Sequence, residues 1–257
     1  MFPIIRIGPL SLQAPGLMLI ISLWIGITLA EKSAKVYKVS AEKLSNLILI
    51  SLVAGVIGAR IVYIAQNPQA FAGNLPNIVS LNPGLLDVAG GIITAIIATF
   101  IYGQKKEMDL WRTLDALIPF FGMLAIGLAT ANLASGDAFG METARPWGIE
   151  LWGATRHPTQ IYTMIGALVT LNLVWPPKQE TRKEAGAQKE AGVGFLTFIA
   201  ITAGYTLFIE AFRGDSTLIL GGIRADQVSA LFVLAVSLWG LDRRLSFRHS
   251  SEQAVQG

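Results

Sequence analysis

Long apolar runs alternate with short polar segments along this chain. Seven runs stand out, at residues 14–30, 47–65, 85–102, 114–134, 161–175, 193–212 and 228–241. Each approaches the ~20 residues that a helix needs to cross the hydrocarbon core of a bilayer, the shorter ones with the help of interfacial residues. Continuous rather than alternating hydrophobicity favours helices over a β-barrel. The pattern therefore predicts an all-α fold, a polytopic membrane helix bundle with about seven transmembrane helices.

Lysine and arginine are concentrated in every second connection. The connections after the first, third and fifth runs and the C-terminal tail carry Lys32, Lys35, Lys38, Lys43, Lys105, Lys106, Arg112, Lys178, Arg182, Lys183, Lys189, Arg243, Arg244 and Arg248. The connection at 66–84 carries none. By the positive-inside rule this alternation predicts an N-out/C-in orientation, with the C-terminus in the cytoplasm. We expect one membrane domain over 1–257, with a mobile cytoplasmic loop at 178–192 and a cytoplasmic tail at 243–257.

Composition supports a chain solvated mostly by lipid. Charged residues make up 14% of it and hydrophobic residues 53%, with a mean hydropathy of +0.54; soluble domains carry about 25% charged residues. The chain has no cysteine, which excludes disulfides, zinc thiolates and a cysteine nucleophile. A formal net charge of +3 indicates no nucleic-acid partner, and the basic loops are better suited to anionic lipid headgroups.

Ionisable groups within the runs need an explanation, because each costs at least about 2.5–3.5 kcal/mol to insert. Arg60 is either a snorkelling anchor or a phosphate contact, for which its guanidinium is well shaped. Asp115 is expected in the first turn of the helix at 114–134, where a carboxylate is favoured. Glu210 and Arg213, three residues apart on one helical face, form either an ion pair or a site for an anionic headgroup.

Other polar residues lie at the same predicted end of the bundle. Asn132 and Asp137 follow a face of small residues, which indicates either close helix packing or a lined cavity. His157 is either a structural cap or a site residue. Together with Arg156, these positions and the charged ones above all map to the extracytoplasmic half, and this convergence favours a functional site there.

Short motifs in this order carry a family resemblance. They are Ile7-Gly8-Pro9-Leu10, Gly16-Leu17-Met18, the segment 58–63, Gly90-Gly91, Asn132, Gly136, Gly140, Arg156-His157-Pro158-Thr159-Gln160-Ile161-Tyr162, Glu210-Ala211-Phe212-Arg213 and Gln227. On these motifs the chain resembles the prolipoprotein diacylglyceryl transferase family over nearly its whole length. The resemblance implies transfer of the diacylglyceryl group of phosphatidylglycerol to the thiol of a lipobox cysteine, at the outer face of the bacterial cytoplasmic (inner) membrane, without a metal or organic cofactor.

The resemblance also implies a set of site residues. A site for this reaction must stabilise the departing phosphate and help the incoming thiol to lose its proton. The implied catalytic residues are Asn132, Asp137 and Glu210. The implied phospholipid-binding residues are Arg60, Gly90, Gly91, Gly140, Arg156, His157, Gln160, Tyr162 and Arg213. The expected partners are phosphatidylglycerol or another anionic phospholipid, a prolipoprotein lipobox peptide, and other membrane subunits.

The chain departs from the family pattern at several of these places. Ala89 stands where the family has histidine, Pro15 where it has tyrosine, and Ala129 and Thr206 where it has arginines. The acidic residue after the fourth run is Asp137 rather than glutamate. Two hypotheses therefore remain: a divergent transferase, or a non-catalytic relative that binds phospholipid as a structural or accessory subunit of a membrane complex.

Overall fold

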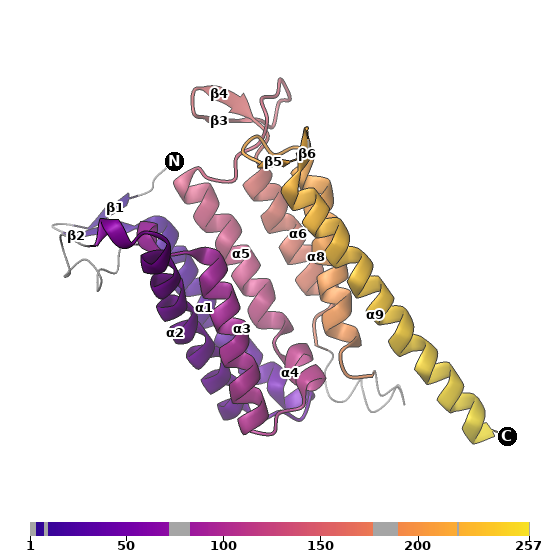
Figure 1. Cartoon of the computed structure of the whole chain (residues 1–257). Coiled ribbons are helices and arrows are strands. Elements are labelled where there is room, and N and C mark those ends of the chain that lie inside the picture. The colour runs from indigo at the N-terminus through magenta and orange to yellow at the C-terminus, as the bar shows by residue number, and fades with distance from the viewer. Residues whose placement is uncertain (1–3, 8–9, 72–82, 177–189, 220, 257) are drawn as a thin grey trace.

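The computed structural model describes residues 4–7, 10–71, 83–176, 190–219 and 221–256 (Figure 1). The helices are α1 (Ala14–Val36), α2 (Ala41–Gln66), α3 (Val88–Lys105), α4 (Leu110–Ala116), α5 (Ile118–Ser135), α6 (Thr159–Leu173), α8 (Val193–Glu210) and α9 (Ala225–Gln256), with short 3-10 turns at Pro68–Ala70 and Pro83–Leu85. Three two-stranded antiparallel hairpins join β1 (Ile4–Ile7) to β2 (Leu10–Gln13), β3 (Ile149–Leu151) to β4 (Ala154–Arg156), and β5 (Leu218–Ile219) to β6 (Ile223–Arg224). The predicted helical bundle is confirmed.

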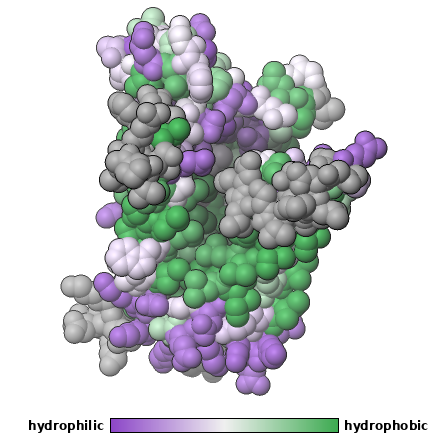
Figure 2. All heavy atoms as spheres, turned by 90° about the vertical axis from the view of Figure 1, so that its left-hand side faces the viewer, coloured by the Kyte–Doolittle hydropathy of each residue, from purple (hydrophilic) through white to green (hydrophobic). Residues whose placement is uncertain are grey.

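Six helices in the described part of the chain are long and apolar enough to cross a membrane: α1, α2, α3, α5, α8 and α9. The fifth predicted run, 161–175, corresponds to α6, which has only 15 residues and is shorter than a usual span. An apolar band lies between hydrophilic ends on the face shown in Figure 2. The chain is a multi-pass membrane protein.

The helices pack in a row that follows α3, α2, α1, α5, α6, α8 and α9 (Figure 1). Helix α1 therefore lies between α2 and α5, and α8 lies between α6 and α9. The hairpins gather at one end of the bundle, called here the hairpin end, and α4 lies at the opposite end, called here the basic end. Small residues allow close approach: a Cβ built on Gly127 of α5 would lie 1.9 Å from Ser22 Oγ of α1.

The fourth predicted run, 114–134, is not one helix, and the expected place of Asp115 is wrong. The chain breaks at Leu117, whose N–H bonds to carbonyls of α4, and α5 then starts with Pro119 in its first turn, where proline's missing N–H costs nothing. Asp115 lies in the last turn of α4 and is 2% exposed. Its carboxylate accepts hydrogen bonds from the N–H groups of Gly192 (2.7 Å) and Phe195 (2.8 Å), which caps the start of α8.

Two further predictions concern the basic end. The backbone of the predicted tail, 243–257, continues α9 as a helix as far as Gln256. Only residues 190–192 of the predicted mobile loop 178–192 are described, and the rest of that prediction lies outside the described residues.

Candidate functional site

Three extended segments meet at the hairpin end and fix the positions of the predicted site residues. The segment after α5 lies between the end of β4 and the turn after α8. On one side the N–H of His157 donates to Met141 O (3.0 Å). On the other side the Met141 N–H donates to Phe212 O (2.7 Å), and the Gly214 N–H donates to Phe139 O (2.9 Å). These bonds bring together parts of the chain that are far apart in sequence.

Gly140 lies at the centre of this crossing. A Cβ on it would lie 2.3 Å from His157 O, closer than real side chains approach a backbone atom. A Cβ on Gly214 would meet Gly140 O at 2.7 Å. The absence of side chains at both positions allows the Arg213 turn to lie directly against the loop after α5, where Gly140 and Arg213 form a β-bridge.

Arg213 and Glu210 form the charged centre of the site. Arg213 Nη1 lies 3.1 Å from Glu210 Oε1, and Arg213 Nε donates to Asp215 Oδ1 at 2.7 Å. Ser216 Oγ donates to the second oxygen of Glu210, whose side chain is only 5% exposed. Burial lowers the pKa of the Arg213 guanidinium, but Asp215, Glu210 and Asp226 raise it by more, so that this pKa lies above its ordinary value and the group stays protonated.

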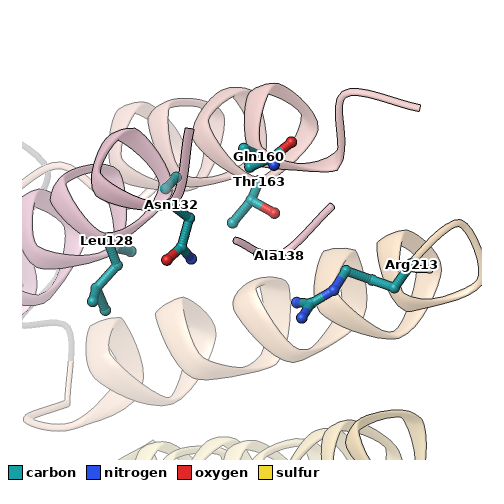
Figure 3. Close-up of a pocket in the computed structure, with 8 residues that line it drawn as sticks. Leu128, Asn132, Ala138, Gln160, Thr163 and Arg213 are labelled. Carbon is teal, nitrogen blue, oxygen red and sulfur yellow. The ribbon is translucent and has the colours of Figure 1, made fainter. Parts of the chain in front are cut away.

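A cavity of about 160 Å³ opens beside this guanidinium, between α5 and α6. It is lined by Ala125, Leu128, Ala129, Asn132, Ala138, Gln160, Thr163 and Arg213. The Asn132 amide and the Arg213 guanidinium both point into the space between the helices drawn in Figure 3. Within the described part of the chain the Asn132 side chain has no hydrogen-bond partner, so both groups can donate to a ligand.

A second cavity, of about 390 Å³, lies between α8 and α9. It is lined by Ile199, Thr202, Ala203, Thr206, Glu210, Arg213, Asp226, Ser229, Ala230 and Val233. Arg213 therefore forms part of the wall of both cavities.

His157 and Tyr162 belong to an aromatic cluster beside the site. Tyr162 OH accepts a hydrogen bond from Trp147 Nε1 (2.9 Å) and lies 3.2 Å from His157 Nδ1. The His157 ring meets the Phe212 ring edge-on, with centroids 5.2 Å apart. These contacts position the turn that precedes Arg213.

Gln160 and Arg156 hold the loop after α5. Gln160 is 1% exposed, and its Nε2 donates to Asp137 O at 2.7 Å. Arg156 donates to Leu151 O (3.1 Å) and Gly140 O (3.4 Å) and bonds Glu142. Because these donors are directed at the protein itself, both side chains shape the wall of the site.

Asp137 begins the loop after α5 and is exposed. Its Oδ2 accepts a hydrogen bond from Ser135 Oγ at 2.7 Å. Gly136, just before it, ends α5 in the left-handed conformation with φ of 85°. The turn thus directs the Asp137 carboxylate out of the helix bundle and leaves it accessible.

A family model described as prolipoprotein diacylglyceryl transferase matches residues 3–242 of the chain. The chain belongs to the prolipoprotein diacylglyceryl transferase family. A phosphatidylglycerol–prolipoprotein diacylglyceryl transferase from Clostridioides difficile (strain 630) is 32% identical over 224 residues, 84% of each chain. One from Thermosynechococcus vestitus (strain NIES-2133 / IAM M-273 / BP-1) is 28% identical over 253 residues, 93% of this chain and 91% of the relative. The resemblance inferred from the motifs is confirmed.

Two of the four positions at which we expected a departure from the family pattern lie on cavity walls. Ala129 lines the cavity between α5 and α6, and Thr206 lines the one between α8 and α9. Pro15 lies in the first turn of α1 and Ala89 in the first turn of α3. Among the described residues that line the two cavities, Arg213 is the only positively charged side chain.

Three residues predicted to bind phospholipid lie elsewhere, on α2 and α3. Arg60 Nη1 donates to Leu85 O at 2.8 Å. Gly90 and Gly91 face α2, where a Cβ on Gly90 would lie 2.5 Å from Val62 Cγ2. Neither cavity is lined by these three residues. Their predicted phospholipid contacts stay a prediction.

Sequence reasoning missed several acidic and hydroxyl groups of the site. Asp215 and Ser216 hold Arg213 and Glu210, and Asp226 lines the larger cavity. The signal for the first two was their position directly after Arg213, because a short turn keeps such neighbours within reach. Among the residues that the structure describes, no group of three His, Asp or Glu could hold a metal ion.

Proposed function

We propose that the chain transfers the diacylglyceryl group of phosphatidylglycerol to the cysteine thiol of a prolipoprotein lipobox, at the outer face of the bacterial inner membrane. Membership of the transferase family and the printed names of its relatives support the substrates. The lysine-rich connections at the basic end support an outward-facing hairpin end by the positive-inside rule. The site therefore faces the side on which lipobox cysteines emerge.

The reaction exchanges one bond for another at a glycerol carbon. The thiolate sulfur attacks the carbon that carries the phosphate ester, a C–S thioether bond forms, and the C–O bond breaks. The bonding electron pair leaves with glycerol phosphate, and the thiol proton passes to a base. The protein must therefore supply donors for the departing phosphate and an acceptor for the proton.

Arg213 and Asn132 are the proposed donors for the phosphate. Arginine has five N–H groups, and Arg213 uses two of them on Glu210 and Asp215, which leaves three for a ligand among the described contacts. Glu210 acts through Arg213, because it fixes the direction of the guanidinium in advance. Preorganised donors of this kind are typically the largest contribution to such catalysis.

Asp137 is the proposed proton acceptor. Asp137 is exposed directly before Ala138, which lines the smaller cavity, and one of its carboxylate oxygens is held by Ser135. Gly140, Arg156, His157, Gln160 and Tyr162 support the loop that presents it. No step of this scheme requires a metal or an organic cofactor.

The observation that carries the proposal is the pair of donors, Asn132 and Arg213, in one cavity of a transferase-family chain. The test uses purified protein in vesicles of labelled phosphatidylglycerol with a lipobox peptide. It measures the thioether product and the released glycerol phosphate, which should form in equal amounts. We expect Asn132→Leu to lower the rate about 10²-fold, the typical cost of one lost donor. Asn172→Leu, the same change at an exposed α6 position outside the cavity, is the matched control.

A non-catalytic lipid-binding role is the second candidate, and the uncharged walls at Ala129 and Thr206 favour it. Such a protein would hold phospholipid as a structural or accessory subunit beside other membrane proteins. Retained phospholipid without any thioether product from the unmodified protein would establish this candidate and reject the enzyme.

A further inference from the structure

The cavity between α8 and α9 is a groove with one polar and one apolar end. Its α8 wall runs through Ile199, Ala203, Thr206 and Glu210. Steps of three or four residues keep these positions on one helical face, and eleven residues of helix rise about 16 Å. The charged end lies at the hairpin end, and the apolar end lies deeper in the bundle. A phospholipid has the same polarity along its length.

The α9 wall repeats this gradient. Asp226 and Ser229 lie in the first turns of α9, while Ala230 and Val233 follow deeper. With about 390 Å³ the groove can hold a headgroup and the start of an acyl chain, and the remaining chain would lie in the membrane. Two facing helices thus present the same sequence of polar and apolar surface.

Charge at the polar end does not suit a simple anion. Glu210 and Asp226 line the groove with Arg213, while Asp215 bonds Arg213 from outside it and Arg224 donates to Glu210 O. Three carboxylates and two guanidiniums leave one excess negative charge. This excess negative charge would repel a lipid whose headgroup carries only negative charge, whereas it would attract an ammonium group.

The groove also offers the two opposite contacts that a zwitterion needs. Asp226 lies in the first turn of α9, where its backbone carbonyl accepts a hydrogen bond from Ser229 Oγ (3.0 Å), while its carboxylate forms no hydrogen bond or ion pair within the described residues. Arg213 has N–H groups left for a phosphate after bonding Glu210 and Asp215. Acceptor and donors therefore line one groove from two helices.

The geometry points to a binding site for an amine-bearing, zwitterionic phospholipid between α8 and α9, with its ammonium group at Asp226 and its phosphate at Arg213. Its acyl chain follows the apolar stripe between the helices. This lipid differs in headgroup charge from the phosphatidylglycerol named for the relatives, and its binding does not depend on the transfer reaction.

Lipid retention tests the site. The protein is placed in vesicles with equal amounts of phosphatidylethanolamine and phosphatidylglycerol, extracted into detergent, and analysed for retained lipid by native mass spectrometry. We expect phosphatidylethanolamine to be retained at least about threefold over phosphatidylglycerol, the scale of one partly exposed ion pair. Asp226→Asn keeps the shape and removes the charge, and should bring the ratio close to one. Asp242→Asn, the same change on α9 outside the groove, should keep the preference.

Labelling at Ser229 gives a second readout that does not depend on extraction. The chain has no cysteine, so Ser229→Cys provides a single thiol in the groove. Phosphatidylethanolamine, but not phosphatidylglycerol, should slow its reaction with a maleimide. Equal retention of both lipids, no retained lipid, or an unchanged preference in Asp226→Asn would overturn the proposal. Because no lipobox peptide is present, these outcomes are independent of whether the chain transfers diacylglyceryl groups.

Discussion

Arg60 and Arg213 were both predicted to bind phospholipid, yet the structure surrounds them differently. Arg60 on α2 donates to the carbonyl of Leu85 and lies over the Phe71 ring, with 5.3 Å to the ring centroid. Arg213 follows α8, is bonded by two carboxylates, and forms a wall of two cavities. The contacts of Arg60 hold Leu85 and Phe71, from the connection between α2 and α3, against α2. Arg213 instead places its positive charge on the walls of two cavities that a ligand can enter.

This difference shows which surroundings make an arginine suitable for function. A guanidinium that bonds a backbone carbonyl and covers an aromatic ring completes the local structure. A guanidinium held by carboxylates is charged and oriented before a ligand arrives. Both arginines lie toward the same end of the bundle, so position along the membrane normal does not separate them. Substitutions in the two regions can.

The largest expected effect is that of Arg213→Ala. We expect the rate of thioether formation to fall about 10²–10³-fold, because the proposed main donor to the departing phosphate is lost. Arg60→Ala should lower the rate no more than about tenfold. Its main effect should be on the free energy of unfolding, which we expect to fall by ~1.5–3 kcal/mol, the contribution of a hydrogen bond to a charged group. The measurements are single-turnover rates and thermal unfolding midpoints in detergent.

Arg213→Ala also leaves the buried Glu210 carboxylate unpaired, so stability must be separated from rate. The double variant Arg213→Ala, Glu210→Gln removes that uncompensated charge and should regain stability without regaining activity. If Arg60→Ala lost as much activity as Arg213→Ala at unchanged stability, the distinction between the two regions would be wrong.

Two glycines sharpen the same contrast at a smaller scale. Gly140→Ala would place a methyl group 2.3 Å from His157 O, and Gly90→Ala would place one 2.5 Å from Val62 Cγ2. We expect Gly140→Ala to lower the rate, because it displaces the site loop, and Gly90→Ala to cost about 1–3 kcal/mol of stability by overpacking. Gly103→Ala on α3 has no atom within 4 Å and should instead stabilise by up to about 1 kcal/mol.

The Gly90→Ala and Gly140→Ala variants distinguish a packing role from a functional role. A packing role lowers the free energy of unfolding, and a functional role lowers the reaction rate. A Gly90→Ala protein with normal unfolding and a strongly reduced rate would place lipid chemistry on α3, as the sequence predicted. A Gly140→Ala protein with an unchanged rate would show that the segment crossing does not position the site.

The sequence predicted most of the long helices well, because a continuous apolar stretch is the main requirement of a membrane span. It also singled out Asn132, Glu210 and Arg213 as candidates, since polar groups beside lipid need a partner or a purpose. The structure places each of them on a cavity wall, and their roles stay a prediction.

The sequence could not predict the contacts of Asp115, because its acceptor role depends on Gly192 and Phe195, which lie far along the chain. Hydropathy likewise gives no sign of a break at Leu117. The sign in the sequence is Pro119, which has no backbone N–H and is tolerated in the first turn of a helix but kinks or breaks a helix interior.

The sequence could not predict that Arg60 lines neither of the two cavities. Arg60 lies near the end of its apolar run and Arg213 directly after its own, and the pattern contains no information on which helices are neighbours. The row places α1 between α2 and α5, which separates Arg60 from Asn132. Charge and hydropathy therefore predict depth in the membrane, while lateral position depends on side-chain packing between helices.

The smallest expected effect tests the edge of the site at Trp147. Its Nε1 donates to Tyr162 OH at 2.9 Å, and Tyr162 keeps its contact with His157 if that bond is lost. Trp147→Phe should therefore remove one hydrogen bond, which contributes about 0.5–1.5 kcal/mol to holding the aromatic cluster in place. We expect a modest loss in the rate of thioether formation. Trp24→Phe changes an exposed tryptophan on α1 outside both cavities and should leave the rate unchanged. Equal losses in the two variants would mean that tryptophan contributes through the membrane interface, and only an excess loss at Trp147 would assign the hydrogen-bonded cluster to the site.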